Sequence, residues 1–287
     1  MSNVVLGSST LQNLLSLQNI NSQMNTTQNA LSTGLSVSSA VDNAVKYFEA
    51  QSLDNRANDL SNRKDAVDQG ISSLTTATQG ISSAITILQQ MQGLVESAKT
   101  ENKTQQAAAA KQLATLAAQF NQLLNDSSYQ GLNLVNSTGS SLSLQFSQSS
   151  SSTLKIAGEN LLISKAVSGS HLASKLVTGL AGVTFSTAVS AGKTSGFDTV
   201  YNALGNSITT LQAAAQSLGS NVSLLQTRLS FTQQYMTTLQ GGANTLTVAD
   251  VNVESTNLVT LQTRQQLAIQ SLSIATQSEQ SVLRLFH

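Results

Sequence analysis

Apolar side chains recur every seven residues along two long stretches of the chain. In the first half the repeat comprises Leu53, Leu60, Val67, Leu74, Ile81, Leu88 and Val95. In the second half it comprises Leu204, Leu211, Leu218, Leu225, Leu239 and Leu246. A heptad sustained over this length predicts a long helix whose apolar stripe is buried on another helix.

The second stretch also has an unbroken complementary set of apolar positions, so only Thr232, between Leu225 and Leu239 of the first set, interrupts the two core positions of the heptad. The complementary positions are Ile208, Ala215, Val222, Leu229, Met236 and Ala243. At about 1.5 Å of rise per residue, residues 204 to 246 would extend roughly 60 Å. Because one stretch lies in each half, the simplest fold is an antiparallel hairpin of rods with the intervening residues at its tip. The predicted rod core comprises Leu53, Leu60, Val67, Leu74, Ile81, Leu88, Val95, Leu211, Leu218, Leu225 and Leu239.

The segments between the two rods have their own patterns. Residues 103 to 125 carry apolar side chains at three- and four-residue steps, which predicts a third helix beside the rods. These side chains are Leu113, Leu116, Phe120, Leu123 and Leu124. Beyond Tyr129 the pattern becomes alternating, which predicts a β-hairpin. The alternating residues are Leu142, Leu144 and Phe146, then Leu154 and Ile156. Val183 and Phe185 suggest further short strands or loops, so residues 129–197 form a small β-containing insert.

The two ends of the chain, residues 1–41 and 247–287, carry weaker helical stripes in an almost uncharged setting. The amino-terminal stripe includes Leu17, Met24 and Leu31, and the carboxyl-terminal one includes Leu261, Leu272, Val282 and Phe286. A solvated helix normally carries Lys and Glu on its outer face, so helices covered in Ser, Thr, Asn and Gln are expected to be surrounded by other protein. The carboxyl-terminal stripe has no evident partner of sufficient size within one chain. We assign it to contacts between copies.

The resulting prediction is a mainly α fold, with a long antiparallel helical-bundle rod, a β-containing insert at the tip and helical termini. The rod helices occupy residues 42–128 and 198–246. Composition agrees, because the chain of 287 residues has no proline, where an average composition would give about 5%. Proline inside a helix costs about 3 kcal/mol, so long helices exclude it.

The charge and the cysteine content of the chain limit the classes of function that it can have. Only 10% of residues are charged and the formal net charge is zero, so nothing favours binding to nucleic acid or anionic lipid. The absence of cysteine excludes disulfides and thiolate sites.

The first charge is Asp42 and the first basic residue Lys46, which argues against a cleaved secretory signal. The chain has no run of eighteen consecutive apolar residues, so the sequence predicts no membrane-spanning helix. We expect a soluble protein that stays in the cytosol or leaves by another route.

Candidate chemistry is sparse, and we expect no catalytic residue, cofactor or metal. The string from Ala191 to Thr194 resembles the end of a phosphate-binding loop, but Thr187 stands where that motif requires glycine. His171 and His287 are too few for a histidine metal site.

Acidic and basic residues alternate near the start of the first rod, where we expect a solvated face with ion pairs such as Asp59 with Arg63. A charged strip that aligns neighbouring subunits is the functional alternative. The residues concerned are Asp54, Arg56, Asp59, Arg63, Lys64, Asp65 and Asp68.

Three strings carry a family resemblance. The first, from Leu31 to Ala44, reads LSTGLSVSSAVDNA and resembles the amino-terminal signature of bacterial flagellins. The second, from Tyr129 to Asn136, reads YQGLNLVN and resembles the turn after that family's second rod helix. The third begins with Leu261–Ala268 (LQTRQQLA), ends with Ser281–Phe286 (SVLRLF), and is most similar to alphaproteobacterial flagellins. Many relatives carry a basic residue at Ser36 and a second Asp at Asn43.

The resemblance implies a structural subunit that polymerises into the flagellar filament outside the cell, with no catalysis. It implies terminal helices in the filament core, a rod layer and a variable outer insert. Its implied partners are copies of itself, the flagellar export apparatus, a chaperone, and cap and hook-junction proteins. The alternative is a hook–filament junction protein. An enzyme or adhesin on a coiled-coil stalk is more distant. By the same resemblance, Gln90 occupies the position of an arginine that a Toll-like receptor recognises in many flagellins.

Overall fold

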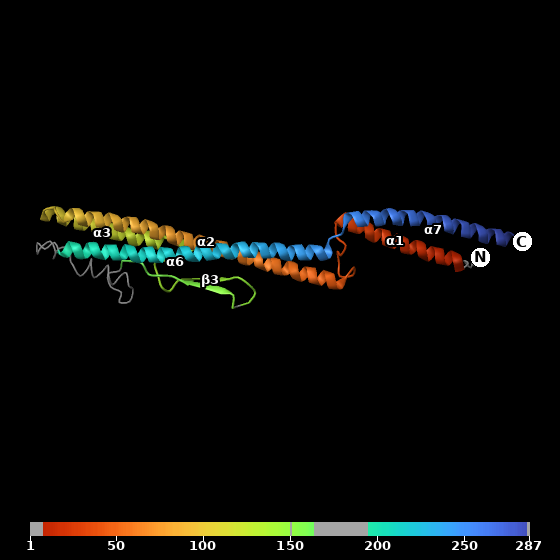
Figure 1. The fold of residues 1–287 in the computed structure, drawn as a ribbon, viewed down its shortest axis with the longest axis horizontal. Coiled ribbons are helices and arrows are strands. Elements are labelled where there is room, and N and C mark those ends of the chain that lie inside the picture. Colours follow the sequence, from red (N-terminus) through yellow and green to blue (C-terminus); the bar gives the residue numbers. More distant parts are fainter. Residues whose placement is uncertain (1–7, 150, 164–194, 286–287) are drawn as a thin grey trace. The chain divides into compact units, whose positions relative to one another are not determined.

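The computed structural model describes residues 8–149, 151–163 and 195–285. The described helices are α1 (Ser8–Thr33), α2 (Ala44–Ala98), α3 (Lys103–Asp126), α6 (Ser195–Thr247) and α7 (Val251–Leu285) (Figure 1). The described strands are β1 (Ser128–Tyr129), β2 (Leu132–Asn133), β3 (Ser141–Gln145) and β4 (Thr153–Ala157). The prediction of a mainly α chain with a small β-containing insert is therefore confirmed. The predicted strands around Val183 and Phe185 lie outside the described residues.

Contacts divide the chain into two compact units. The central unit spans Asp59–Tyr235, and the terminal unit combines Met1–Asn58 with Met236–His287. Each is described by itself below.

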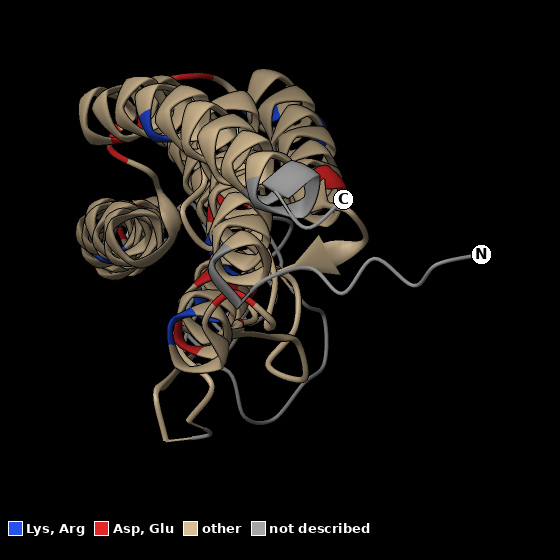
Figure 2. Ribbon diagram, turned by 90° about the vertical axis from the view of Figure 1, so that its right-hand side faces the viewer, with Lys and Arg blue, Asp and Glu red and all other residues tan. Residues whose placement is uncertain are grey.

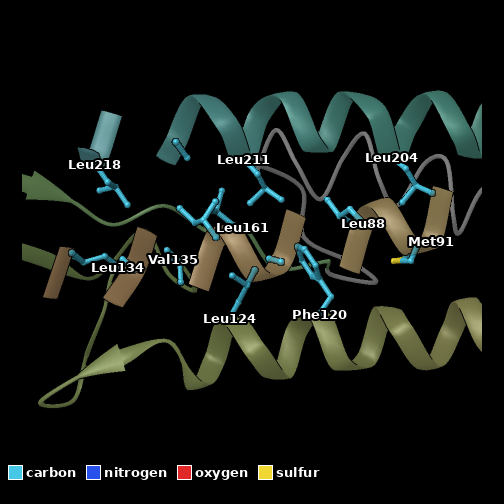
Figure 3. Close-up of a cluster of buried hydrophobic side chains, with 14 of the residues drawn as sticks. Leu88, Met91, Phe120, Leu124, Leu134, Val135, Leu161, Leu204, Leu211 and Leu218 are labelled. Atoms are coloured by element: carbon cyan, nitrogen blue, oxygen red, sulfur yellow. The ribbon is translucent and has the colours of Figure 1, made fainter. Parts of the chain in front are cut away.

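The central unit is built around one buried apolar cluster to which α2, α3, α6 and the β segments all contribute (Figure 3). Helices α2 and α6 run antiparallel, since Lys99 near the end of α2 pairs with Asp198 near the start of α6, and Gln92 contacts Tyr201. The side chains that are almost completely buried are Leu74, Ile81, Leu88, Met91, Val95, Phe120, Leu124, Val135, Leu204, Leu211 and Leu225.

Helix α3 begins with a complete capping box. The Asn102 side chain accepts a hydrogen bond from the Gln105 N–H at 3.0 Å, and the Gln105 side chain accepts one from the Asn102 N–H at 3.4 Å. The Gln106 amide then donates to the Ala98 carbonyl at the end of α2. These bonds satisfy orphan groups at two helix ends, which allows the chain to reverse direction within a few residues.

The β-hairpin β3–β4 pairs Ser141 with Ala157 through Gln145 with Thr153. It does not lie at the tip of the rods, as the sequence suggested. Leu144 reaches Gly70 in the middle of α2, where a Cβ would come within 2.6 Å of it. Alternation identified the buried face correctly, because Leu144 and Ile156 are buried. That face gains most by lying flat along the helices, so the hairpin covers their side.

In the terminal unit, α1 and α7 lie side by side and antiparallel (Figure 1). The Asn13 amide donates to the Ser271 hydroxyl at 3.4 Å. The Gln265 amide donates to the Asn21 side chain at 2.7 Å. The prediction that the carboxyl-terminal stripe lacks a partner within one chain is therefore wrong. Its partner is α1, whose own weak stripe gave little indication of the pairing.

Candidate assembly surfaces

The proposed rod-core residues lie mostly inside the helical packing. Leu74, Ile81, Leu88, Val95, Leu211 and Leu225 are 0% exposed, and Leu60, Val67, Leu218 and Leu239 are also buried. Leu53 is half-buried. Thr232, which interrupts the heptad, is buried too, and its hydroxyl donates to the Arg228 carbonyl at 2.9 Å. A helical carbonyl thus satisfies the only polar group at that heptad position.

The terminal helices have one covered face and one open face. Leu261 is buried, whereas Leu17, Met24, Leu31 and Leu272 are half-buried. The side chains of Val282 and Phe286 lie outside the described residues. Several other large apolar side chains of these helices are more than a third exposed, namely Leu11, Leu14, Leu15, Val259, Leu267, Ile269 and Ile274.

This open face is unusual because almost nothing charged accompanies it. Helix α1 contains no charged residue, and the sequence of α7 contains only Glu254, Arg264, Glu279 and Arg284. Figure 2 shows how sparse charged residues are over the whole described chain. Exposed apolar groups without a charged surround mark a surface that other protein covers. The arrangement is therefore suited to assembly with further chains.

The connection from α1 to α2 is pinned to the connection from α6 to α7. Helix α1 ends at Thr33, and the next residue, Gly34, has a φ of +73° that suits glycine. The Ser36 N–H then donates to the Thr247 carbonyl at 2.8 Å, and the Ala249 N–H donates to the Gly34 carbonyl at 2.9 Å. The Ser36 hydroxyl also donates to the Thr247 carbonyl. Where many relatives carry a basic residue, this side chain therefore joins the two connections by a hydrogen bond and contributes no positive charge.

Asp42 organises the turn that leads into α2. Its Oδ2 atom accepts hydrogen bonds from the hydroxyls and backbone N–H groups of Ser38 and Ser39, all between 2.9 and 3.0 Å. The Ser38 hydroxyl, then the Ser39 hydroxyl and the two N–H groups, hold the pKa of the Asp42 carboxyl below its ordinary value. Asn43 caps α2 by accepting from the Lys46 N–H. The LSVSSAVDN string is thus a structural turn.

The YQGLNLVN string forms a second compact turn. Gln130 and Gly131 both have positive φ, 50° and 81°, as a tight hairpin turn between β1 and β2 requires. The Asn133 amide donates to the carbonyls of Leu124 and Asn125 at the end of α3, and its Oδ1 accepts from the Val135 N–H. This buried side chain therefore closes α3 and positions the chain that follows.

The charged start of α2 differs from expectation. The predicted Asp59–Arg63 pair is wrong, because Asp59 instead accepts a hydrogen bond from the Gln148 amide of the β3–β4 loop. Lys64 lies 3.6 Å from both Asp65 and Asp68. Arg63 Nε is buried without a hydrogen-bond partner. The expectation failed because the competing group comes from far along the chain.

Gln90 is exposed on α2.

The described residues contain no group of three or more His, Cys, Asp or Glu placed to hold a metal ion. Within the same part of the chain, no helix is long and apolar enough to cross a membrane. His171 and the Ala191–Thr194 string lie outside the described residues.

Comparisons with known proteins decide the family. The model of the bacterial flagellin N-terminal helical region matches residues 7–140, and that of the C-terminal helical region matches residues 201–286. The chain belongs to the bacterial flagellin family. The flagellin resemblance, and its alphaproteobacterial character, are confirmed.

Individual relatives align only in part. The chain is 42% identical over 89 residues to flagellin A of Rhizobium meliloti, covering 31% of this chain and 22% of the relative. It is 39% identical over 111 residues to flagellin FljM of Caulobacter vibrioides, covering 38% of each. A crystal structure of Bacillus cereus flagellin matches 56% of this chain and 88% of that one, with 18% identity and a TM-score of 0.36. These values are too low to establish a shared fold.

Proposed function

We propose that this chain is a structural subunit that polymerises into the flagellar filament and has no catalytic role. The observation that carries the proposal is the pairing of two nearly uncharged terminal helices, α1 and α7, that leave large apolar side chains exposed. The match of both ends to flagellin family models supports it. No observation favours the hook–filament junction alternative.

In this proposal the two kinds of apolar position have separate roles. Heptad residues such as Leu74 and Leu211 stabilise the single chain, whereas Leu17, Met24, Leu31, Leu261, Leu272, Val282 and Phe286 belong to the filament-core segments. Residues 1–41 and 247–287 are these segments, 42–128 and 198–246 are the rod, and 129–197 are the outer insert. Export through the flagellar apparatus, with its chaperone, cap and hook-junction partners, is part of the same proposal, and the match to the flagellin family models supports it.

Electron microscopy of the purified chain after addition of short filament seeds tests the proposal. We expect helical filaments whose mass grows with added protein. Protein that stays dispersed with seeds, under conditions where it is folded by circular dichroism, would overturn the assignment.

Receptor recognition is a secondary expectation at exposed Gln90. A neutral amide cannot supply the five cationic donors of an arginine side chain. The chain should therefore activate the Toll-like receptor poorly, and Gln90→Arg should raise the signal in a receptor reporter assay. Equal signals from the two proteins would count against this role for position 90.

A further inference from the structure

The β3–β4 hairpin is a two-stranded sheet, so no described strand covers the outer edge of β3 or that of β4. The Phe146 N–H donates to the Ser152 carbonyl, and the Gly158 N–H donates to the Ser140 carbonyl. These bonds identify which facing residues of the hairpin are hydrogen-bonded pairs. In an antiparallel pair, hydrogen-bonded positions alternate with non-hydrogen-bonded ones. The backbone groups of Ser143 and Gln145 therefore point away from β4, toward the free edge of β3.

A groove of about 450 Å³ lies beside this edge. Its walls are Asp59, Asn62, Arg63 and Ala66 of α2 and Ser143, Leu144 and Gln145 of β3. We call it the β3 groove.

Arg63 gives the β3 groove an unmet hydrogen-bonding requirement. Its Nε is buried without a partner, and a buried donor left unpaired costs free energy. Asp59, the other charged residue of the groove, is already bonded to the Gln148 amide. The groove thus presents backbone edge groups beside the half-buried, cationic side chain of Arg63, a combination that fits an extended chain bearing an oxygen acceptor.

The β3 edge also lacks the features that normally protect an edge strand. Natural edges are blunted by charged residues, proline or a covering element. The strand Ser141–Gln145 has no charge and no proline, whereas β4 carries exposed Lys155 directly opposite Ser143. A two-stranded sheet is by itself marginal in water. An edge left open in this way is expected to be covered when the protein functions.

We propose that the β3 groove receives an extended segment of a second copy of this chain, which adds a strand to β3 and places an oxygen acceptor against Arg63. The proposal rests on the proposed function, because in a homopolymer the neighbour at every lattice position is another copy. A segment added there would pair with Ser143 and Gln145 and lie over Asn62 and Ala66 of α2.

Residue-resolved hydrogen exchange of the wild-type chain tests this directly. Ser143 and Gln145 amides should exchange rapidly in the monomer and at least about tenfold more slowly in filaments, since each gains a hydrogen bond there. The Phe146 amide, already bonded within the hairpin, serves as the internal control and should be protected in both states. Rapid exchange of Ser143 and Gln145 in filaments would overturn the proposal. Failure of the wild-type chain to form filaments would instead refute the proposed function, and the groove assignment with it.

A matched pair of variants provides an independent test. Ser143→Pro and Lys155→Pro each remove an outward-pointing N–H at paired positions on opposite edges of the same hairpin. Ser143→Pro should slow seeded filament growth by about tenfold, the effect of losing roughly one hydrogen bond per subunit, whereas Lys155→Pro should not. Equal growth rates of the two variants would contradict the proposal. If Ser143→Pro lowers the thermal midpoint of the monomer more than Lys155→Pro, the exchange measurement on the wild-type chain decides.

Discussion

The Asp42 carboxylate stabilises the turn before α2 because a single oxygen accepts four hydrogen bonds from Ser38 and Ser39. Such bonds favour the charged form, which accounts for the direction of its pKa shift. The sequence marked Asp42 as part of a family string, yet the string did not indicate that two serines are its partners. Short-range hydrogen bonds of this kind depend on the local backbone conformation, which a hydrophobic pattern does not specify.

This carboxylate gives a pH prediction with a definite sign. The folded pKa lies below the ordinary value of 3.8, so the stabilisation is fully present above that value and is lost as the pH falls through the folded pKa. Replacing both serines, in Ser38→Ala/Ser39→Ala, should raise the pKa of Asp42 toward its ordinary value. Carboxyl ¹³C chemical shifts measured across the acid range report it, and an unchanged pKa would contradict the hydrogen-bond explanation.

Two neighbouring leucines on α6 separate packing from simple hydrophobicity. Leu225 is 0% exposed and Leu224 is 44% exposed. Leu225→Ala should lower the free energy of unfolding by about 2–5 kcal/mol, because it removes buried methyl groups and leaves a cavity. Leu224→Ala should cost less than about 1 kcal/mol. Urea unfolding followed by circular dichroism measures both, and equal losses would show that the heptad register is wrong.

At the scale of the elements, long periodic patterns were the most informative part of the sequence. The three- and four-residue steps predicted a helix over residues 103–125, and α3 spans Lys103–Asp126. Alternation likewise located β3 and β4. The position of the hairpin on the helices did not follow, because alternation identifies the buried face of a strand and not the surface against which it packs. The Asp59–Gln148 contact joins residues 89 positions apart, so local charge spacing could not reveal it.

The capping box of α3 offers a test at this scale. Asn102→Ala removes the acceptor for the Gln105 N–H and should destabilise the chain by about 1 kcal/mol. Thr104→Ala is the matched control, since Thr104 is exposed within the first turn and its hydroxyl makes no hydrogen bond to a described residue. Thermal unfolding of the two variants compares them. Equal midpoint temperatures of thermal unfolding for the two variants would show that the Asn102 cap does not stabilise the chain.

At the scale of the whole molecule, the sequence indicated that the ends differ from the rest of the chain but not how they pair. The stripes of α1 and α7 are weak, and their polar residues are uncharged, so neither pattern specified a partner. The structure shows that each helix covers part of the other and still leaves apolar side chains open. These exposed side chains, and not the covered ones, are the residues through which we expect copies to associate.

The open face of α7 provides the most direct test of this account. Leu267 and Ile274 are 64% and 61% exposed, so Leu267→Gln/Ile274→Gln should leave the thermal unfolding of the monomer nearly unchanged. Burial of each side chain between subunits would contribute about 2 kcal/mol, and its loss should abolish growth from seeds. Gln262→Ala/Gln270→Ala, on exposed polar positions of the same helix, is the control. Seeded elongation followed by light scattering should show growth for the wild-type chain and the control and none for the Leu267/Ile274 variant. Elongation of that variant at the wild-type rate would contradict the claim that the terminal helices assemble the polymer.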